Sequence, residues 1–216
     1  PDKVLRITHN GHAILEMELD FLTKSPKYRR QYRTKEITPI VPVLAPPDDY
    51  NEILFSLLSS LNICSRDWVI RRYDHEVRGS TVIKPLQGRI GFYTHGDSAV
   101  IRPVRHSLKG LAITADVNPR WVEIDPYWGA ASAVDEVCRN LAAVGAVPHS
   151  LADCLNFGNP EKPERLGDFV QVAHGLYLVA SALQISFVSG NVSFYNESHS
   201  GAIPPTPTIF GVGTIE

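Results

Sequence analysis

The chain has 216 residues, of which 44% are hydrophobic and 20% charged, and its formal net charge is −2. This length and composition are typical of one globular core with a short additional piece. The low net charge and a pI of about 6.5 exclude an overall attraction to nucleic acid or to an anionic membrane, so we expect neither as a partner. No apolar run approaches the length that spans a bilayer.

Cysteine usage indicates a reducing compartment. Cys64, Cys138 and Cys154 make an odd total without C-x-x-C spacing, which suits free thiols better than disulfides or a zinc site. No secretory signal is present, so we expect a cytoplasmic protein. The chain starts at Pro1 without a methionine and stops in an apolar run at Glu216, and we interpret it as a piece of a longer protein.

The first two segments differ in composition from the rest. Residues 4–22 predict a β-hairpin that turns at Asn10-Gly11, and because a lone hairpin is marginal in water we assign residues 1–23 to the tail of a preceding domain. Residues 24–49 combine a basic run with Pro39, Pro42, Pro46 and Pro47, which predicts an extended linker. The basic run is either a phosphate-binding patch or a solvated linker face, and the second interpretation is favoured.

Residues 50–216 predict the main domain. Hydrogen-bond acceptors at Asp49 and Glu52 indicate the start of a helix that ends near Asn62, and we expect its leucine stripe to be buried. A second short helix is expected after Ser65. Strands are expected over 77–85, 97–102, 111–116, 121–124 and 149–155, long helices over 130–145 and 164–184, and a final strand after 207. This order favours a single α+β domain with a mixed or mainly antiparallel sheet packed by helices.

The stretch from Ile185 to Glu197 carries the first candidate site. An apolar run enters Gly190-Asn191 and a second alternating run leaves it, which predicts a turn between two strands. A glycine allows a ligand close to the backbone, and Asn191 and Ser193 would point to the same side of an extended chain. Two interpretations are open. The segment is either a hairpin turn whose polar groups form hydrogen bonds with one another, or a strand-to-turn edge that binds a phosphate and its metal.

A second polar loop follows Asp153. Residues 153–159 contain an aspartate and several amides beside a glycine, and if the two strands are neighbours, both loops lie on one edge of the sheet. Such groups suit a magnesium nucleotide better than acyl chemistry, with Asp153 as the candidate carboxylate. Neither a P-loop nor a G-x-G-x-x-G motif is present. Asp74, His75 and Glu76 are consecutive and would point apart, so no metal cluster is expected there.

Several motifs together resemble the synthetase subunit of phosphoribosylformylglycinamidine synthase. The most specific are Asp-Cys-Leu-Asn-Phe-Gly-Asn-Pro at 153–160 and Gly-Asn-Val-Ser at 190–193. The others lie, in chain order, at 73–79, 114–129, 133–140, 194–197 and 205–209. The resemblance covers nearly the whole chain.

The resemblance implies a fold and a function. Residues 50–216 would be an N-terminal domain like that of aminoimidazole ribonucleotide synthetase, in the second half of a chain with two pseudo-repeated halves. The enzyme would use ATP, Mg²⁺ and glutamine-derived ammonia to convert formylglycinamide ribonucleotide to the amidine in purine biosynthesis. The implied partners are the missing first half of the same chain, a glutaminase subunit and a small accessory subunit.

The resemblance also implies residue roles. Asp153 and Gly190 would contact ATP, Asn191 would bind Mg²⁺ and Ser193 would contact the ribonucleotide, while Asp97, Asp116, Asn156 and Asn159 are weaker candidates for an auxiliary nucleotide or for loop structure. No catalytic residue is expected within this chain, because the family's catalytic histidine and most metal ligands belong to the first half. The isolated chain is therefore expected to be inactive and to form homodimers through the exposed apolar surface. The alternative is a non-catalytic nucleotide-binding or assembly module that packs against a partner domain.

Overall fold

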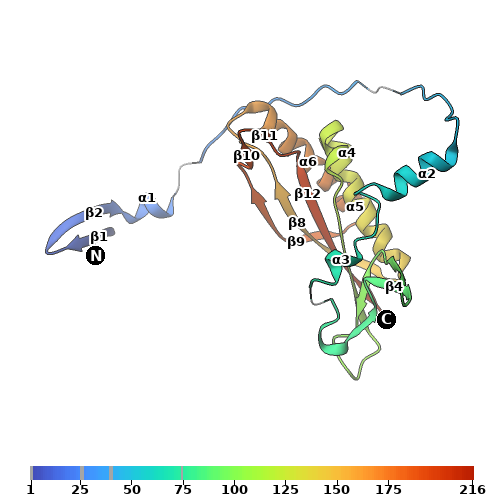
Figure 1. The fold of residues 1–216 in the computed structure, drawn as a ribbon. Coiled ribbons are helices and arrows are strands. Elements are labelled where there is room, and N and C mark those ends of the chain that lie inside the picture. The colour runs from blue at the N-terminus through green and yellow to red at the C-terminus, as the bar shows by residue number, and fades with distance from the viewer. Residues whose placement is uncertain (1, 25–26, 39–40, 74) are drawn as a thin grey trace. The chain divides into compact units, whose positions relative to one another are not determined.

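The computed structural model describes residues 2–24, 27–38, 41–73 and 75–216 (Figure 1). The chain divides into two compact units, Pro1–Gln31 and Tyr32–Glu216. Pro39 of the expected linker and Asp74 of the 73–79 motif lie outside the described residues. No helix among the described residues is long and apolar enough to cross a bilayer.

The smaller unit contains the predicted hairpin. Strands β1 (Val4–His9) and β2 (His12–Glu18) pair antiparallel around Asn10 and Gly11, whose φ angles of 49° and 79° are the left-handed values of a tight turn. The expectation of strand up to residue 22 was wrong, because Leu19–Thr23 forms the short helix α1. An ion pair of 2.8 Å between Asp20 and Lys24, one turn apart, stabilises this helix.

A six-stranded sheet organises the larger unit. Its order is β3-β6-β7-β12-β8-β9, and every neighbouring pair is antiparallel except β8 and β9. The strands span Thr81–Ile83 (β3), Ala99–Ile101 (β6), Gly110–Asp116 (β7), Thr206–Ile215 (β12), Val147–Asn156 (β8) and Ser186–Ser193 (β9). The predicted α+β class with a mixed sheet is confirmed.

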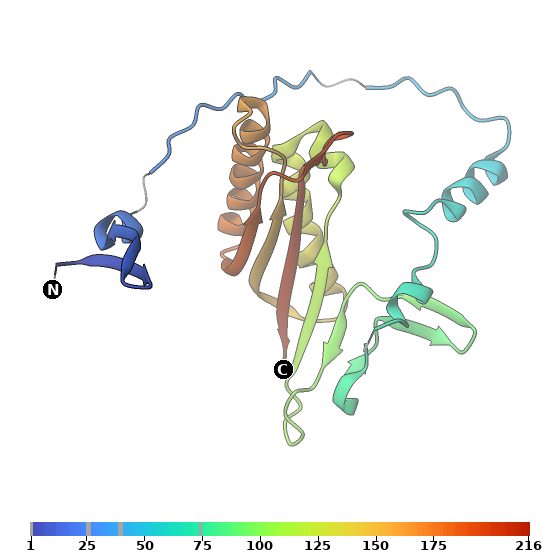
Figure 2. The same cartoon turned by 60° about the vertical axis from the view of Figure 1, so that its left-hand side comes forward.

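Two long helices, α5 (Pro126–Ala143) and α6 (Pro163–Ala182), cover one face of this sheet (Figure 1 and Figure 2). Helix α6 connects β8 to the parallel strand β9, as a crossover between parallel strands requires. The core between helices and sheet is built from aliphatic side chains and Phe157, which is 1% exposed. No helix of the described residues covers the other face, where Phe210 on β12 is 42% exposed, whereas its neighbour Ile209 is fully buried.

The segment expected as a strand at 121–124 is instead helix α4 (Pro119–Ile124). The Asn118 side chain accepts a hydrogen bond from the Trp121 N–H at 3.3 Å, and Pro119 occupies the first helical turn. Asp125 repeats this arrangement at the start of α5, where its carboxylate accepts from two backbone N–H groups. A side-chain cap followed by proline starts a helix despite the β-propensity of the residues that follow.

The predicted first helix forms, but its leucine stripe is not buried. Helix α2 (Tyr50–Ser59) begins at Asp49, whose side chain accepts from the Asn51 N–H, and ends three residues before Asn62. Leu54, Leu57 and Leu58 are each more than half exposed, so the expected burial was wrong. The remaining small elements are α3 (Asp67–Ile70), the 3₁₀ turn Val77–Gly79, and the two-stranded pairs β4–β5 (Leu86–Arg89, Phe92–His95) and β10–β11 (Glu197–Ser198, Gly201–Ala202).

Part of the expected linker belongs to the larger unit and contacts helix α6. The Arg33 N–H donates to the Pro163 carbonyl at 2.9 Å, and the Arg33 guanidinium pairs with Glu164 at 3.0 Å. A side chain on Gly167 would overlap the Arg33 carbonyl, so this backbone passes directly over α6. The described part of residues 27–48 has no regular secondary structure, as its prolines predict.

Candidate functional site

Asp153 and Gly190 occupy paired positions on the parallel strands β8 and β9. A Cβ atom on Gly190 would overlap the Asp153 carboxylate, so only a glycine leaves room for that side chain. The condition that the two strands are neighbours is therefore met. Both residues lie within strands, however, and the expected turn at Gly190-Asn191 was wrong, because β9 continues through both residues to Ser193.

The Asp153 carboxyl lies in a partly buried environment. Burial raises the pKa of the Asp153 carboxyl above its ordinary value, and the backbone N–H of Asn191 partly offsets this by stabilising the carboxylate. The group is only half-buried, so water still reaches it. A carboxyl group in this setting can accept hydrogen bonds from hydroxyl or amino groups of a ligand.

A cavity of about 650 Å³ opens beside Asp153, between β8, β9 and helix α6. Its walls include Leu155, Leu176 and Phe187, and Asp153 is the charged residue among the described groups that line it. Its size and its apolar walls with few polar groups are typical of small-molecule sites. The cavity places Asp153 and Gly190 on the face of the sheet that the helices cover.

Asn191 and Ser193 face the opposite side of the sheet. Successive residues of a strand alternate between faces, so Asn191 points away from Gly190 and shares its side with Ser193. Their register partners on β8 are Cys154 and Asn156. The structure therefore brings the four principal candidates onto adjacent strands but divides them between two faces.

Ser193 belongs to a hydrogen-bond network at the end of β9. The Asn196 amide nitrogen donates to the Ser193 hydroxyl at 3.1 Å, to the Ser193 carbonyl at 3.0 Å and to the Phe157 carbonyl at 3.0 Å. The Phe157 N–H donates back to the Ser193 carbonyl at 2.9 Å. The two most specific sequence motifs are thus joined to each other by hydrogen bonds.

The weaker candidates Asn156 and Asn159 have structural partners. The Asn156 amide donates to the Cys154 carbonyl at 3.1 Å, and the Asn159 side chain accepts from the Glu161 N–H at 2.8 Å. The Asn159 N–H donates to Glu197 at 2.9 Å, and Lys162 pairs with the same carboxylate at 2.7 Å. This lysine holds the pKa of the Glu197 carboxyl below its ordinary value. These contacts order the loop that follows β8.

The other two weaker candidates lie on the far side of β12 from Asp153. Ile209 pairs with both Asp116 on β7 and Asp153 on β8, so the two carboxylates occupy one row across the sheet. Burial, together with Glu136 on α5, raises the pKa of Asp116 to about 7. Asp97 precedes β6, and its carbonyl accepts from the Thr114 hydroxyl at 2.8 Å.

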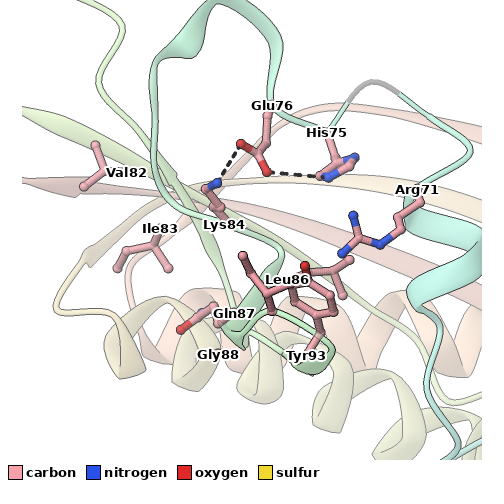
Figure 3. Close-up of a pocket in the computed structure, with 11 residues that line it drawn as sticks. Arg71, His75, Glu76, Val82, Ile83, Lys84, Leu86, Gln87, Gly88 and Tyr93 are labelled. Atoms are coloured by element: carbon pink, nitrogen blue, oxygen red, sulfur yellow. Dashed lines mark ion pairs between the residues drawn. The ribbon is translucent and has the colours of Figure 1, made fainter.

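A second cavity, of about 580 Å³, was not predicted from the sequence. It lies beside β3 and the β4–β5 pair, and Figure 3 shows Arg71, Lys84 and Tyr93 around it. Lys84 pairs with Glu76 at 3.0 Å, and the Arg71 guanidinium lies 4.4 Å from the centre of the Tyr93 ring. The signal for this cavity in the sequence is Lys84, which directly follows β3. A lysine after a strand indicates a cavity only when the neighbouring elements are known.

Magnesium is the metal that the family resemblance implies. In the part of the chain that the structure describes, no group of three or more His, Cys, Asp or Glu residues is arranged to hold a metal. Asn191 and Asp153 point to opposite faces of the sheet and do not converge on one ion. The described residues therefore do not fit a metal site of their own.

The part of the chain that forms most of the sheet and its two covering helices matches a known family. The family model for AIR synthase related protein, N-terminal domain, matches residues 95–215, and the chain belongs to this family. Among individual proteins, it is similar to the phosphoribosylformylglycinamidine synthase subunit PurL of Thermoplasma acidophilum, with 41% identity over 215 residues. That match covers 100% of this chain and 28% of the relative, so the chain spans little more than a quarter of that protein.

Solved structures share the fold. The structure of PurLQS from Thermotoga maritima matches with a TM-score of 0.70 and 24% identity, covering 99% of this chain and 32% of that chain. T. maritima PurL complexed with ATP matches with a TM-score of 0.64 at 25% identity, and the same protein complexed with FGAR with 0.65 at 25% identity. Both of these matches cover 99% of this chain and 31% of the other.

Proposed function

We propose that this chain forms the nucleotide-binding part of a phosphoribosylformylglycinamidine synthase. The observation that carries the proposal is the Asp153–Gly190 pair, which places one carboxylate in an otherwise uncharged cavity between β9 and α6. The similarity to PurL, one structure of which holds ATP, supports the same assignment.

The chemistry of the cavity suggests which part of ATP it takes. A carboxylate repels phosphate oxygens but accepts hydrogen bonds from ribose hydroxyls or from the adenine amino group. The apolar walls at Leu155, Leu176 and Phe187 suit a nucleoside. We therefore assign Asp153 and Gly190 to the nucleoside end of ATP.

The other candidate residues of this chain would take part in the reaction of the whole synthase. In the proposed reaction, ATP phosphorylates the formamide oxygen of formylglycinamide ribonucleotide, and ammonia from glutamine then displaces phosphate to form the amidine. Ser193 would contact the ribonucleotide, and Asn191 would supply one neutral oxygen to Mg²⁺. Asp116, Asp97, Asn156 and Asn159 would support the fold around the site.

The proposed partners are the rest of the same chain, a glutaminase subunit and a small accessory subunit, and the chain alone is expected to be inactive. The similar PurL proteins are subunits of phosphoribosylformylglycinamidine synthase, which supports such an assembly. The three cysteines are free, which supports a cytoplasmic location.

Calorimetric titration with ATP in the presence of magnesium tests the proposal. The wild-type chain should bind, and Asp153→Ala should weaken binding about tenfold, because a buried hydrogen bond to the ligand is lost. Asp48→Ala and Asn62→Ala, both exposed, are matched controls. Absence of any heat of binding at millimolar ATP would count against the proposal.

A second candidate function has its own observation. The helix-free face of the sheet exposes Phe210 and Ile113, each about two-fifths accessible, which favours a module that packs against a partner domain without binding a nucleotide. The same titration separates the two candidates, because an assembly module would not bind ATP.

A further inference from the structure

A basic groove lies beside β3 and β6, at the opposite edge of the sheet from β9. It encloses about 560 Å³ between residues 78–82 and residues 102–106. Its polar lining consists of three arginines, Arg78, Arg102 and Arg105, together with His106 and the hydroxyls of Ser80 and Thr81. We propose that this basic groove binds a small molecule through its phosphate groups.

The charge of the groove is not neutralised within the chain. Among the described residues, no carboxylate lines the groove, and none of its three arginines forms an ion pair. The cavity in Figure 3 differs in this respect, because Arg71 pairs with Asp67 at 2.6 Å and Lys84 pairs with Glu76 at 3.0 Å. A local cluster of cations in a chain of net charge −2 indicates a specific anionic ligand.

The two walls are held together by the backbone. The Arg102 N–H donates to the Ser80 carbonyl at 2.8 Å, and Thr81 pairs with Ile101 across β3 and β6. These bonds hold the backbone at Arg102 beside Ser80, and the side chains of Arg102, Ser80 and Thr81 all line the groove. A guanidinium beside hydroxyl donors is a common arrangement for holding phosphate oxygens, because both donate hydrogen bonds and the guanidinium also supplies charge.

The turn that carries Arg78 is conformationally unusual. Arg78 has a φ of 67° and Gly79 a φ of 61°, whereas Ser80 returns to the right-handed region at −96°. A left-handed conformation is unfavourable for an arginine, so the fold keeps this side chain at a strained position. A left-handed residue followed by a right-handed one also turns successive N–H groups toward a common concavity, which binds anions.

The residues that line the groove also indicate which chemical group of a ligand can bind there. No Phe, Tyr or Trp side chain is among the described residues that form the groove, so it offers no aromatic face on which a nucleobase would stack. Three arginines suit a pyrophosphate or a similarly charged group better than a single carboxylate. The groove is therefore assigned to the phosphate moiety of a ligand and is separate from the cavity at Asp153.

Titration of inorganic pyrophosphate into the 216-residue chain tests the proposal. Arg102→Gln/Arg105→Gln should weaken binding at least about tenfold, since two charged hydrogen-bond donors are removed. Arg72→Gln/Arg120→Gln is the control, because it removes the same charge from two exposed arginines outside the groove. Circular dichroism establishes that both variants fold.

A further variant separates binding in the basic groove from binding at the proposed ATP site. Asp153→Ala should leave pyrophosphate affinity within about twofold, because β8, which carries Asp153, is separated from β6 by β7 and β12. The proposal is overturned if the wild-type chain does not bind millimolar pyrophosphate, if both arginine variants lose equal affinity, or if Asp153→Ala abolishes binding.

Discussion

The carboxylate of Asp153 occupies the space that a side chain on Gly190 would need. The contact exists because β8 and β9 are parallel neighbours in which these two residues share a register position. A parallel pair requires a crossover, here helix α6, so the site depends on three elements that are distant in sequence. Its geometry is a direct consequence of the strand order.

Gly190→Ala should destabilise the fold by about 1 kcal/mol, because the new methyl group forces the Asp153 side chain out of its position. Urea denaturation measures the loss. The double variant Gly190→Ala/Asp153→Ala provides the control, since the smaller side chain at 153 removes the overlap. A double variant that loses as much stability as the two single variants combined would show that the contact has no energetic importance.

Asp116 makes stability depend on pH. Its pKa is about 7 in the folded chain, against roughly 3.9 in an unfolded one, so between these values the folded state retains a proton that the unfolded state releases. Stability should therefore fall as the pH rises from about 4 to about 7. The cause is burial together with the neighbouring Glu136, and Arg139 partly opposes it.

Asp116→Asn should reduce this pH dependence and stabilise the chain at pH 8 relative to wild type. Solvent screening limits the gain to the order of 1 kcal/mol. Urea unfolding at pH 5 and pH 8 measures both effects. Parallel pH profiles for the variant and the wild type would contradict the prediction.

Asn196→Ala should loosen the end of β9 and the loop after β8. Its amide nitrogen makes three hydrogen bonds to Ser193 and Phe157, and their loss should cost about 1 to 3 kcal/mol. Hydrogen exchange should accelerate over residues 156–162. Asn62→Ala, at an exposed position, is the matched control, and equal exchange in both variants would exclude the proposed role.

The helix-free face predicts self-association of the isolated chain. Phe210 on β12 and Ile113 on β7 are both exposed on this face, and burying them between two copies would remove apolar surface from water. Phe210→Asp should weaken dimerisation at least about tenfold in sedimentation experiments. Phe92→Asp, on the separate β4–β5 pair, should leave it unchanged. A wild-type chain that stays monomeric at high concentration would refute the prediction.

Local sequence signals predicted the long helices and most strands. The spacing of apolar residues located α5 and α6, and Asn10-Gly11 located the turn of the hairpin. The segment at Trp121 was assigned wrongly because the cap at Asn118 and the following proline determine its conformation more strongly than β-propensity does. In the same way, α2 shows helical periodicity, yet periodicity alone does not determine whether its apolar side is covered.

The candidate site was predicted in part. Asp153 and Gly190 were selected from the sequence, but their arrangement depends on the register between distant strands, which no local pattern encodes. A glycine beside an asparagine usually indicates a turn, and here the glycine serves instead to admit the Asp153 side chain. The basic groove was missed because Arg78 and Arg102 become neighbours only through the pairing of β3 with β6.

The alternation along β9 has a consequence for any ligand pair at this position. Gly190 and Asn191 are adjacent in the chain yet point to opposite sides of the outermost strand of the sheet. A nucleotide at Gly190 and a second substrate at Asn191 would therefore lie on opposite sides of β9. Only the backbone of this strand would separate them. Strand β9 would then separate the two ligands, and a small movement of this strand would change its contacts with both of them.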